Sequence, residues 1–136
     1  MENTPYATFD YSELPIIKIE FTGEDATDEN FEHYLKEMVE IPSKTKYYIL
    51  IMDTSKSSYL SVKHRILQGQ YLEENKEHIA QKAIATLFIT PSFLHRTILK
   101  ALFVIKSYPS PVFIIGNQEE ASQKIEELLK DEKINT

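Results

Sequence analysis

A run of polar side chains between residues 53 and 61 holds the residue types that could do chemistry. Asp53 ends an apolar segment, and the hydroxyl-bearing residues Thr54, Ser57, Ser58 and Ser61 follow it. A carboxylate and several hydroxyls can hydrogen-bond a ligand or a partner. Ligands of open α/β sheets bind beyond the carboxyl ends of strands, at the point where the strand order reverses, so we predict a partner or ligand loop here. The alternative is a polar loop whose aspartate caps the following helix.

The histidines do not show the spacing of a metal site. They are His33, His64, His78 and His95. Glu74 lies four residues before His78, which is more typical of an exposed pair on a helix than of an acid–base site. A small hydrolase that uses Asp53 and a histidine is an alternative, and it needs those groups to converge in a cleft. We predict no catalytic residue, no metal and no cofactor.

The segment after Pro91 is apolar at almost every position. We predict a helix that opens with this proline and runs to about Ser107. A helix that is apolar nearly all round lies in the core, covers an interface between copies of the chain, or lines a pocket for a lipid-like ligand. These three interpretations stay open. The residues assigned to the interface or pocket are Phe93, Arg96, Lys100 and Phe103, with His95 at the polar edge.

The composition excludes several classes of protein. The chain has 136 residues, no cysteine and three glycines that lie far apart. Disulfide scaffolds, thiolate metal sites and glycine-rich phosphate loops are therefore excluded. The net charge of −6 argues against a nucleic-acid binder. Acids crowd residues 20–40 but are absent from residues 78–118. The charges either mark a solvated acidic helix or steer a partner or an anionic ligand to the basic side.

The first residues and the apolar runs bear on location. Residues 1–5 show no basic and apolar leader pattern. The longest apolar runs, Tyr47–Met52 and Ala101–Ile105, are shorter than the roughly 20 residues of a membrane helix. We therefore expect a cytoplasmic protein with no membrane span. We expect a single domain over residues 1–136, with an ordered core at about 6–130.

Hydrophobic patterning predicts the elements that position these residues. Apolar and charged residues alternate in Ile16–Phe21, which indicates a half-buried strand, whereas Tyr47–Met52 is apolar throughout, like a strand covered on both faces. Thr27 caps a helix that Pro42 ends. Strands are expected at 6–11, 16–21, 47–52, 83–90 and 112–115, and helices at 28–41, 59–81 (with a break left open at Gly69), 91–107 and 118–131. The order ββαβαβαβα predicts an α/β fold with a mostly parallel sheet, an antiparallel N-terminal edge and four helices.

Over about residues 6–130 this element order resembles the STAS domain superfamily (sulfate transporter and anti-sigma factor antagonist). Within it, the chain is most similar to the SpoIIAA-like group, which is related to CRAL-TRIO lipid carriers. The nearest local match is Ser110-Pro-Val-Phe-Ile-Ile-Gly-Asn-Gln-Glu-Glu-Ala121, which looks like the last strand and an acid-led helix. STAS anti-anti-sigma factors carry an Asp-Ser-Ser-Gly-like loop whose serine is phosphorylated. The comparable Tyr59-Leu60-Ser61-Val62-Lys63-His64 lacks that pattern, and Ser61 is the nearest phosphorylation candidate.

The resemblance and the lack of a catalytic motif imply a non-catalytic binding domain that engages a protein partner in bacterial-type signalling. The alternative is a carrier or sensor of a small apolar or amphipathic ligand. That alternative predicts a cavity of some hundreds of Å³ beside the helix that follows Pro91. A homodimer formed through this apolar helix is a separate expectation.

Overall fold

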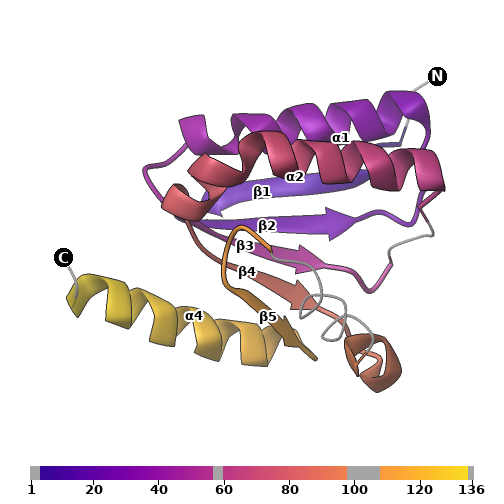
Figure 1. Ribbon diagram of the computed structural model, residues 1–136. Coiled ribbons are helices and arrows are strands. Elements are labelled where there is room, and N and C mark those ends of the chain that lie inside the picture. The colour runs from indigo at the N-terminus through magenta and orange to yellow at the C-terminus, as the bar shows by residue number, and fades with distance from the viewer. Residues whose placement is uncertain (1–3, 57–59, 98–107, 135–136) are drawn as a thin grey trace.

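In the computed structural model, helices cover both faces of one five-stranded sheet (Figure 1). The structure describes residues 4–56, 60–97 and 108–134. Of the predicted site residues, Ser57, Ser58, Lys100 and Phe103 lie outside these ranges. The elements are β1 (Ala7–Glu13), β2 (Ile16–Phe21), α1 (Asp28–Glu40), the 3-10 turn η1 (Ile41–Ser43), β3 (Tyr48–Asp53), α2 (Val62–Lys82), β4 (Ala83–Ile89), β5 (Val112–Ile115) and α4 (Gln118–Ile134). Residues 93–97 are also helical.

The strands lie in the sheet in their sequence order, β1-β2-β3-β4-β5. β1 and β2 form an antiparallel hairpin, and β2 to β5 run parallel. The predicted α/β class, with an antiparallel N-terminal edge, an otherwise parallel sheet and four helices, is confirmed. The strand order never reverses, so the switch point that we expected beside Asp53 does not exist and that expectation was wrong. The carboxyl ends of β2, β3 and β4 nevertheless meet at one edge of the sheet (Figure 1).

Helix α1 begins at the predicted cap. The Thr27 hydroxyl accepts a hydrogen bond from the Asn30 backbone N–H at 3.1 Å, and the Asn30 side chain accepts one from the Thr27 N–H at 2.8 Å. This reciprocal pair satisfies two backbone donors that the first turn leaves without a helical partner. One face of the helix packs in the core, where Phe31, Tyr34 and Met38 are buried.

Helix α2 is continuous from Val62 to Lys82. It starts later than predicted because Ser61, in extended conformation, is its cap. The break left open at Gly69 does not occur. A glycine inside a helix costs only about 1 kcal/mol relative to alanine, which the contacts of one long helix with the sheet and α1 offset.

The helix after β4 also starts later than predicted. The Ser92 carbonyl accepts from the Arg96 backbone N–H at 2.9 Å, and the Ser92 hydroxyl accepts from the His95 N–H at 3.4 Å. Ser92 is therefore the cap, and the prediction that Pro91 takes the first helical position was wrong. A serine side chain provides the acceptor that the first turn requires, which proline cannot. The predicted end near Ser107 lies outside the described residues.

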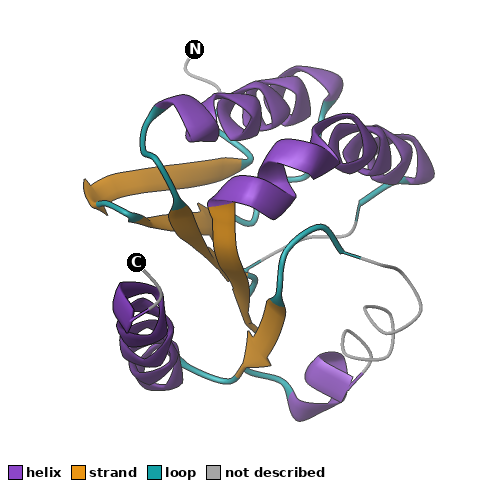
Figure 2. Ribbon diagram, turned by 60° about the vertical axis from the view of Figure 1, so that its left-hand side comes forward, coloured by secondary structure: helices purple, strands orange, loops and turns teal. Residues whose placement is uncertain are grey.

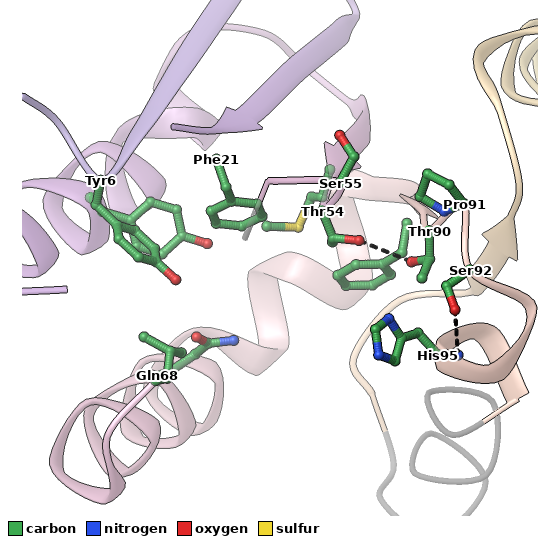
Figure 3. Close-up of a pocket in the computed structure, with 13 residues that line it drawn as sticks. Tyr6, Phe21, Thr54, Ser55, Gln68, Thr90, Pro91, Ser92 and His95 are labelled. Atoms are coloured by element: carbon green, nitrogen blue, oxygen red, sulfur yellow. Dashed lines mark hydrogen bonds between the residues drawn. The ribbon is translucent and has the colours of Figure 1, made fainter. Parts of the chain in front are cut away.

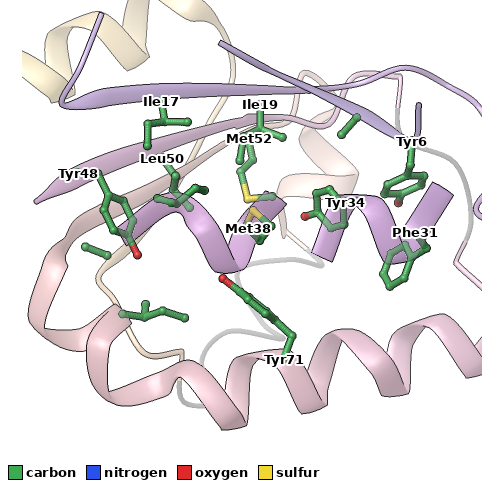
Figure 4. Close-up of a cluster of buried hydrophobic side chains, with 14 residues drawn as sticks. Tyr6, Ile17, Ile19, Phe31, Tyr34, Met38, Tyr48, Leu50, Met52 and Tyr71 are labelled. Carbon is green, nitrogen blue, oxygen red and sulfur yellow. The ribbon is translucent and has the colours of Figure 1, made fainter. Parts of the chain in front are cut away.

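Two cores form, one on each face of the sheet, and Figure 2 shows α1 and α2 on one side and α4 on the other. Successive strand residues point to opposite faces, so the apolar β3 contributes to both cores. On the α1/α2 face the buried strand residues are Ala7, Ile17, Ile19, Tyr48, Leu50, Met52 and Ala83 (Figure 4). On the α4 face the buried residues are Ile49, Ile51, Ala85, Leu87, Ile89 and Ala121. No helix in the described ranges is long and apolar enough to cross a membrane.

Candidate functional site

A pocket of about 580 Å³ opens on the α1/α2 face, at the carboxyl ends of β2, β3 and β4 (Figure 3). It joins side chains from parts of the chain that lie far apart in the sequence. They are Tyr6, Phe21, Tyr34, Met52, Thr54, Ser55, Leu60, Gln68, Phe88, Thr90, Pro91, Ser92 and His95. The pocket thus lies beside the helical residues 93–97, where the ligand-carrier interpretation expected a cavity.

The walls of the pocket are mainly apolar and aromatic. Phe21, Met52 and Phe88 extend from the ends of three neighbouring strands. Two tyrosines complete the aromatic wall, with Tyr6 and Tyr34 packed edge to face at a ring-centroid distance of 5.3 Å. No aspartate, glutamate, lysine or arginine is among the lining residues that the structure describes. A concave apolar surface with a few polar groups is the usual form of a small-molecule site.

Hydroxyl groups line the rim of the pocket at the ends of β3 and β4. The Thr54 hydroxyl donates to the Ile89 carbonyl at 2.9 Å and lies 3.0 Å from the Thr90 hydroxyl. The Ser55 hydroxyl donates to Asp53 Oδ1 at 2.6 Å. These bonds fix the loop after β3 to the end of β4. They also use the protons of the Thr54 and Ser55 hydroxyls within the protein.

Asp53 itself faces away from the pocket. It is the last residue of β3 and alternates in direction with the pocket residue Met52. Its carboxylate accepts from the Ser55 backbone N–H at 2.9 Å and from the Gln118 side chain at 3.5 Å. Asp53 therefore holds its own loop. It is not the N-cap of α2, which is Ser61, and it does not line the pocket.

Only some of the residues of the predicted partner or ligand loop lie at the pocket. Thr54 lines the pocket, whereas Asp53 and Ser61 do not. The hydrolase interpretation needs a histidine at Asp53, and no hydrogen bond or ion pair between Asp53 and any of the four histidines is found in the described part of the chain. In the same ranges, no group of three histidine, aspartate or glutamate side chains could hold a metal ion.

Ser61 belongs to a separate cluster that joins α1 to α2. His64 Nδ1 lies 2.9 Å from the Ser61 hydroxyl, and His64 Nε2 lies 3.1 Å from Asp28 Oδ1. Lys63 Nζ donates to Asp28 Oδ2 at 2.8 Å. These two contacts lower the pKa of Asp28 from its ordinary value of 3.8, the hydrogen bond from Lys63 having the larger effect and that from His64 the smaller. The imidazole packs on Phe31 at a ring-centroid distance of 5.0 Å.

The order serine, histidine, aspartate in this cluster has the residue types of a nucleophilic triad. Two features give it a structural explanation instead. The Ser61 hydroxyl is the cap of α2 and accepts the His64 backbone N–H at 3.3 Å. The Asp28 side chain is 69% exposed, and its carboxylate is shared with Lys63. Ser61, Asp28 and His64 therefore fasten the first turns of two helices to each other.

Arg96, which was predicted to belong to an interface or a pocket, holds the backbone at the ends of two strands. Its Nη1 donates to the Thr90 carbonyl at 2.9 Å and to the Pro91 carbonyl at 2.8 Å. A Cβ at Gly116 would lie 3.1 Å from the same nitrogen, so the guanidinium packs against the backbone that follows β5. Arg96 thus ties the ends of β4 and β5 together, and it does not line the pocket. Phe93 is 75% exposed and does not line it either.

The sequence interpretation missed most of the pocket. In the sequence, nothing distinguishes the individual aromatic lining residues from ordinary apolar strand and helix residues. These lining residues are Tyr6, Phe21, Tyr34 and Phe88. The available indication was the gathering of aromatic residues near the carboxyl ends of the predicted strands. Gln68 carries no indication at all, because a polar residue on a long helix is usually solvated.

Comparison with protein-family models, with curated proteins and with solved structures gives no match to this chain.

Proposed function

We propose that this chain is a binding domain for a small apolar or amphipathic molecule, which it holds in the pocket beside residues 93–97. The observation that carries the proposal is a cavity of about 580 Å³ with aromatic walls and a rim of hydroxyl groups. Its size falls within the usual range for ligand sites, about 300–1,000 Å³. Burial of a ligand's apolar body against Phe21, Met52 and Phe88 would supply most of the binding free energy.

The domain acts by binding and not by catalysis in this proposal. Asp53 is occupied with loop contacts, and the Ser61 hydroxyl is occupied as a helix cap. The family proposal remains a STAS-like domain. Its support is the element order, two strands followed by alternating helices and strands, on which the resemblance rests.

Binding of a neutral apolar dye tests the proposal. N-phenylnaphthylamine fluoresces weakly in water and strongly when buried, so the protein should enhance its fluorescence at a ratio of one dye per chain. Leu60→Trp places a larger side chain in the pocket wall and should abolish the enhancement. Leu67→Trp is the matched control, because Leu67 lies on α2, is partly exposed and does not line the pocket.

The result is clear in both directions. Loss of dye binding in Leu60→Trp alone supports the pocket as the binding site. If the parent protein does not bind the dye, or if both variants bind it as the parent does, the proposed function is wrong. Far-ultraviolet circular dichroism of each variant shows that the fold is retained.

A protein partner is the second candidate, and exposed apolar side chains on two segments favour it. Phe93 is 75% and Leu94 66% exposed, and Val62 and Ile66 are exposed four residues apart on α2. Large exposed apolar side chains are the usual anchors of protein interfaces. Leu94→Ser should remove a partner that is captured from the native cell. Val39→Ser, a change of an exposed residue on α1, should retain it. Light scattering that shows a monomer at high micromolar concentration would remove the homodimer form of this candidate.

A further inference from the structure

Two phenol groups in the pocket have no partner. Tyr6 is 4% and Tyr34 5% exposed. Both line the pocket, and in the described part of the chain neither hydroxyl makes a hydrogen bond. Figure 3 shows the Tyr6 oxygen directed into the space between Phe21 and Gln68. The fully buried side-chain atoms without a partner in the described residues are Tyr11 Oη and His78 Nε2, so the phenol oxygens of Tyr6 and Tyr34 are accessible from the pocket. They are therefore available to a polar group on a bound ligand.

The two phenols are hydrogen-bond donors. Burial raises the pKa of Tyr6 above its ordinary value of 10.0 and that of Tyr34 well above it. Both side chains consequently keep their protons at neutral pH. At the opposite rim the hydroxyl protons of Thr54 and Ser55 are already donated within the protein. The phenols thus offer donors to an oxygen atom on a ligand, in addition to the Gln68 amide and the Ser92 hydroxyl, which also line the pocket.

In the described residues, the pocket wall carries no fixed charge to pair with an ionic head group. No lysine, arginine, aspartate or glutamate is among its described lining residues, where His95 at the rim is the titratable group apart from the tyrosines. Lys56 and Arg96 each follow a lining residue in the sequence, but neither lines the pocket, and Arg96 turns its Nη1 to two backbone carbonyls. Transfer of an unpaired charge from water into such a site is strongly unfavourable. A neutral oxygen acceptor does not carry this cost.

We infer that the ligand is an uncharged amphipathic molecule, an alcohol or ester with a hydrocarbon body, whose oxygen accepts hydrogen bonds from Tyr6 and Tyr34. This inference rests on the proposed function and names the chemistry of its ligand. The hydrocarbon body lies along Phe21, Met52 and Phe88, toward the rim at Thr90 and Ser92. The acid-rich segment 20–40 and the acid-free segment 78–118 then have no part, through their charges, in holding the buried portion of the ligand.

Three probes of equal chain length test the charge requirement. Decanol, decanoate and decylammonium are titrated into the full chain at neutral pH by calorimetry, decanol below its solubility limit and the two ions below their critical micelle concentrations. Decanol should bind at least about tenfold more tightly than either ion, a difference that corresponds to about 1.4 kcal/mol. The ions share its hydrocarbon body, so the difference isolates the head group.

Removal of one phenol oxygen tests the position of the head group. Tyr34→Phe keeps the ring and should weaken decanol binding by about two- to tenfold, the usual effect of a lost neutral hydrogen bond. Tyr6→Phe should do the same. Tyr71→Phe is the matched control, because Tyr71 is buried in the same core but does not line the pocket. It should leave decanol affinity unchanged.

The outcomes separate this inference from the proposed function. If decanoate or decylammonium binds as tightly as decanol, the pocket binds amphipathic molecules but the uncharged ligand class is wrong. If Tyr34→Phe and Tyr6→Phe bind decanol as the parent does, the placement of its oxygen is wrong. If none of the three probes binds, the proposed function fails, and the inference fails with it.

Discussion

The two faces of the sheet are packed by different kinds of side chain. Among the described residues, the buried core of the α4 face consists of isoleucine, leucine and alanine, with the partly buried Phe113 packed against it. The buried residues on the α1/α2 face include the aromatic residues Tyr6, Phe31, Tyr34, Tyr48 and Tyr71 as well as Met38 and Met52. The pocket lies on this second face and nowhere touches the aliphatic core.

The difference follows from how each face is covered. On the α4 face one helix approaches the sheet closely, with the small Ala121 fully buried at the contact. Short aliphatic side chains fill such a narrow space at close to crystal density. On the other face two helices lie across four strands, and large rings are needed to reach from Tyr71 on α2 toward the sheet (Figure 4). The pocket opens beside these rings, between Tyr34 of α1, Gln68 of α2 and the ends of the strands.

Equal truncations on the two faces should give unequal losses of stability. Leu87→Ala empties a fully buried position of the aliphatic core and should lower the free energy of unfolding by about 3–5 kcal/mol. Met52→Ala should cost about 2 kcal/mol, since Met52 borders a space that is already open. Urea denaturation followed by circular dichroism measures both. Equal losses would mean that the pocket is not an open space in solution.

Removal of the α2 cap should weaken only the aromatic face. Ser61→Ala deletes the acceptor of the His64 backbone N–H and should lower the free energy of unfolding by about 1 kcal/mol. Ser61→Asp keeps an acceptor at the cap and should restore most of this loss. Hydrogen exchange measured by mass spectrometry should be faster in α2 of Ser61→Ala than in α2 of the parent protein, whereas exchange in α4 should not change. Faster exchange in α4 as well would contradict the separation of the two faces.

A change inside α2 that leaves the core untouched should stabilise the protein. A Cβ at Gly69 meets no atom within 4 Å, so Gly69→Ala adds no clash. It should raise the free energy of unfolding by about 0.5–1 kcal/mol, because alanine loses less backbone entropy in a helix. Thermal unfolding measures the gain. A destabilised Gly69→Ala variant would show that the helix approaches a neighbour more closely here than the structure has it.

The smallest effect expected is a pH dependence at the contact between α1 and α2. The folded-state pKa of Asp28 lies below its ordinary 3.8, so the ionised carboxylate stabilises the folded state above that value. The contribution is lost as the pH falls through the lowered pKa. Asp28→Asn should therefore show a flatter decline of stability in acid than the parent does. Asp10→Asn is a poor control, since hydrogen bonds from Ser12 also lower the pKa of Asp10. Asp25→Asn, which lies in the loop before α1, is the better one.

Much of the fold could be predicted because its determinants are local. The alternation in Ile16–Phe21 depends only on the pleat of a strand, and the Thr27 cap depends on one turn of helix. The start of the helix after β4 was misplaced for a local reason too, since Pro91 and Ser92 both favour a helix N-terminus and the serine supplied the acceptor. The site could not be predicted in the same way. Thr54 was found because it follows a strand, but Tyr6 and Tyr34 meet in the pocket only through pairing of β1 with β2 and packing of α1.

The sequence by itself determined the periodicity of the elements, and therefore the α/β class, because hydrophobic spacing is a property of neighbours along the chain. The tertiary structure decided which polar groups are used within the fold and which remain free. It turned Asp53, Ser61 and Arg96 to backbone and loop contacts, and it left the phenols of Tyr6 and Tyr34 facing an open space. Hydrogen-bond partners are chosen by distance and direction in three dimensions, so no spacing along the chain could have assigned them.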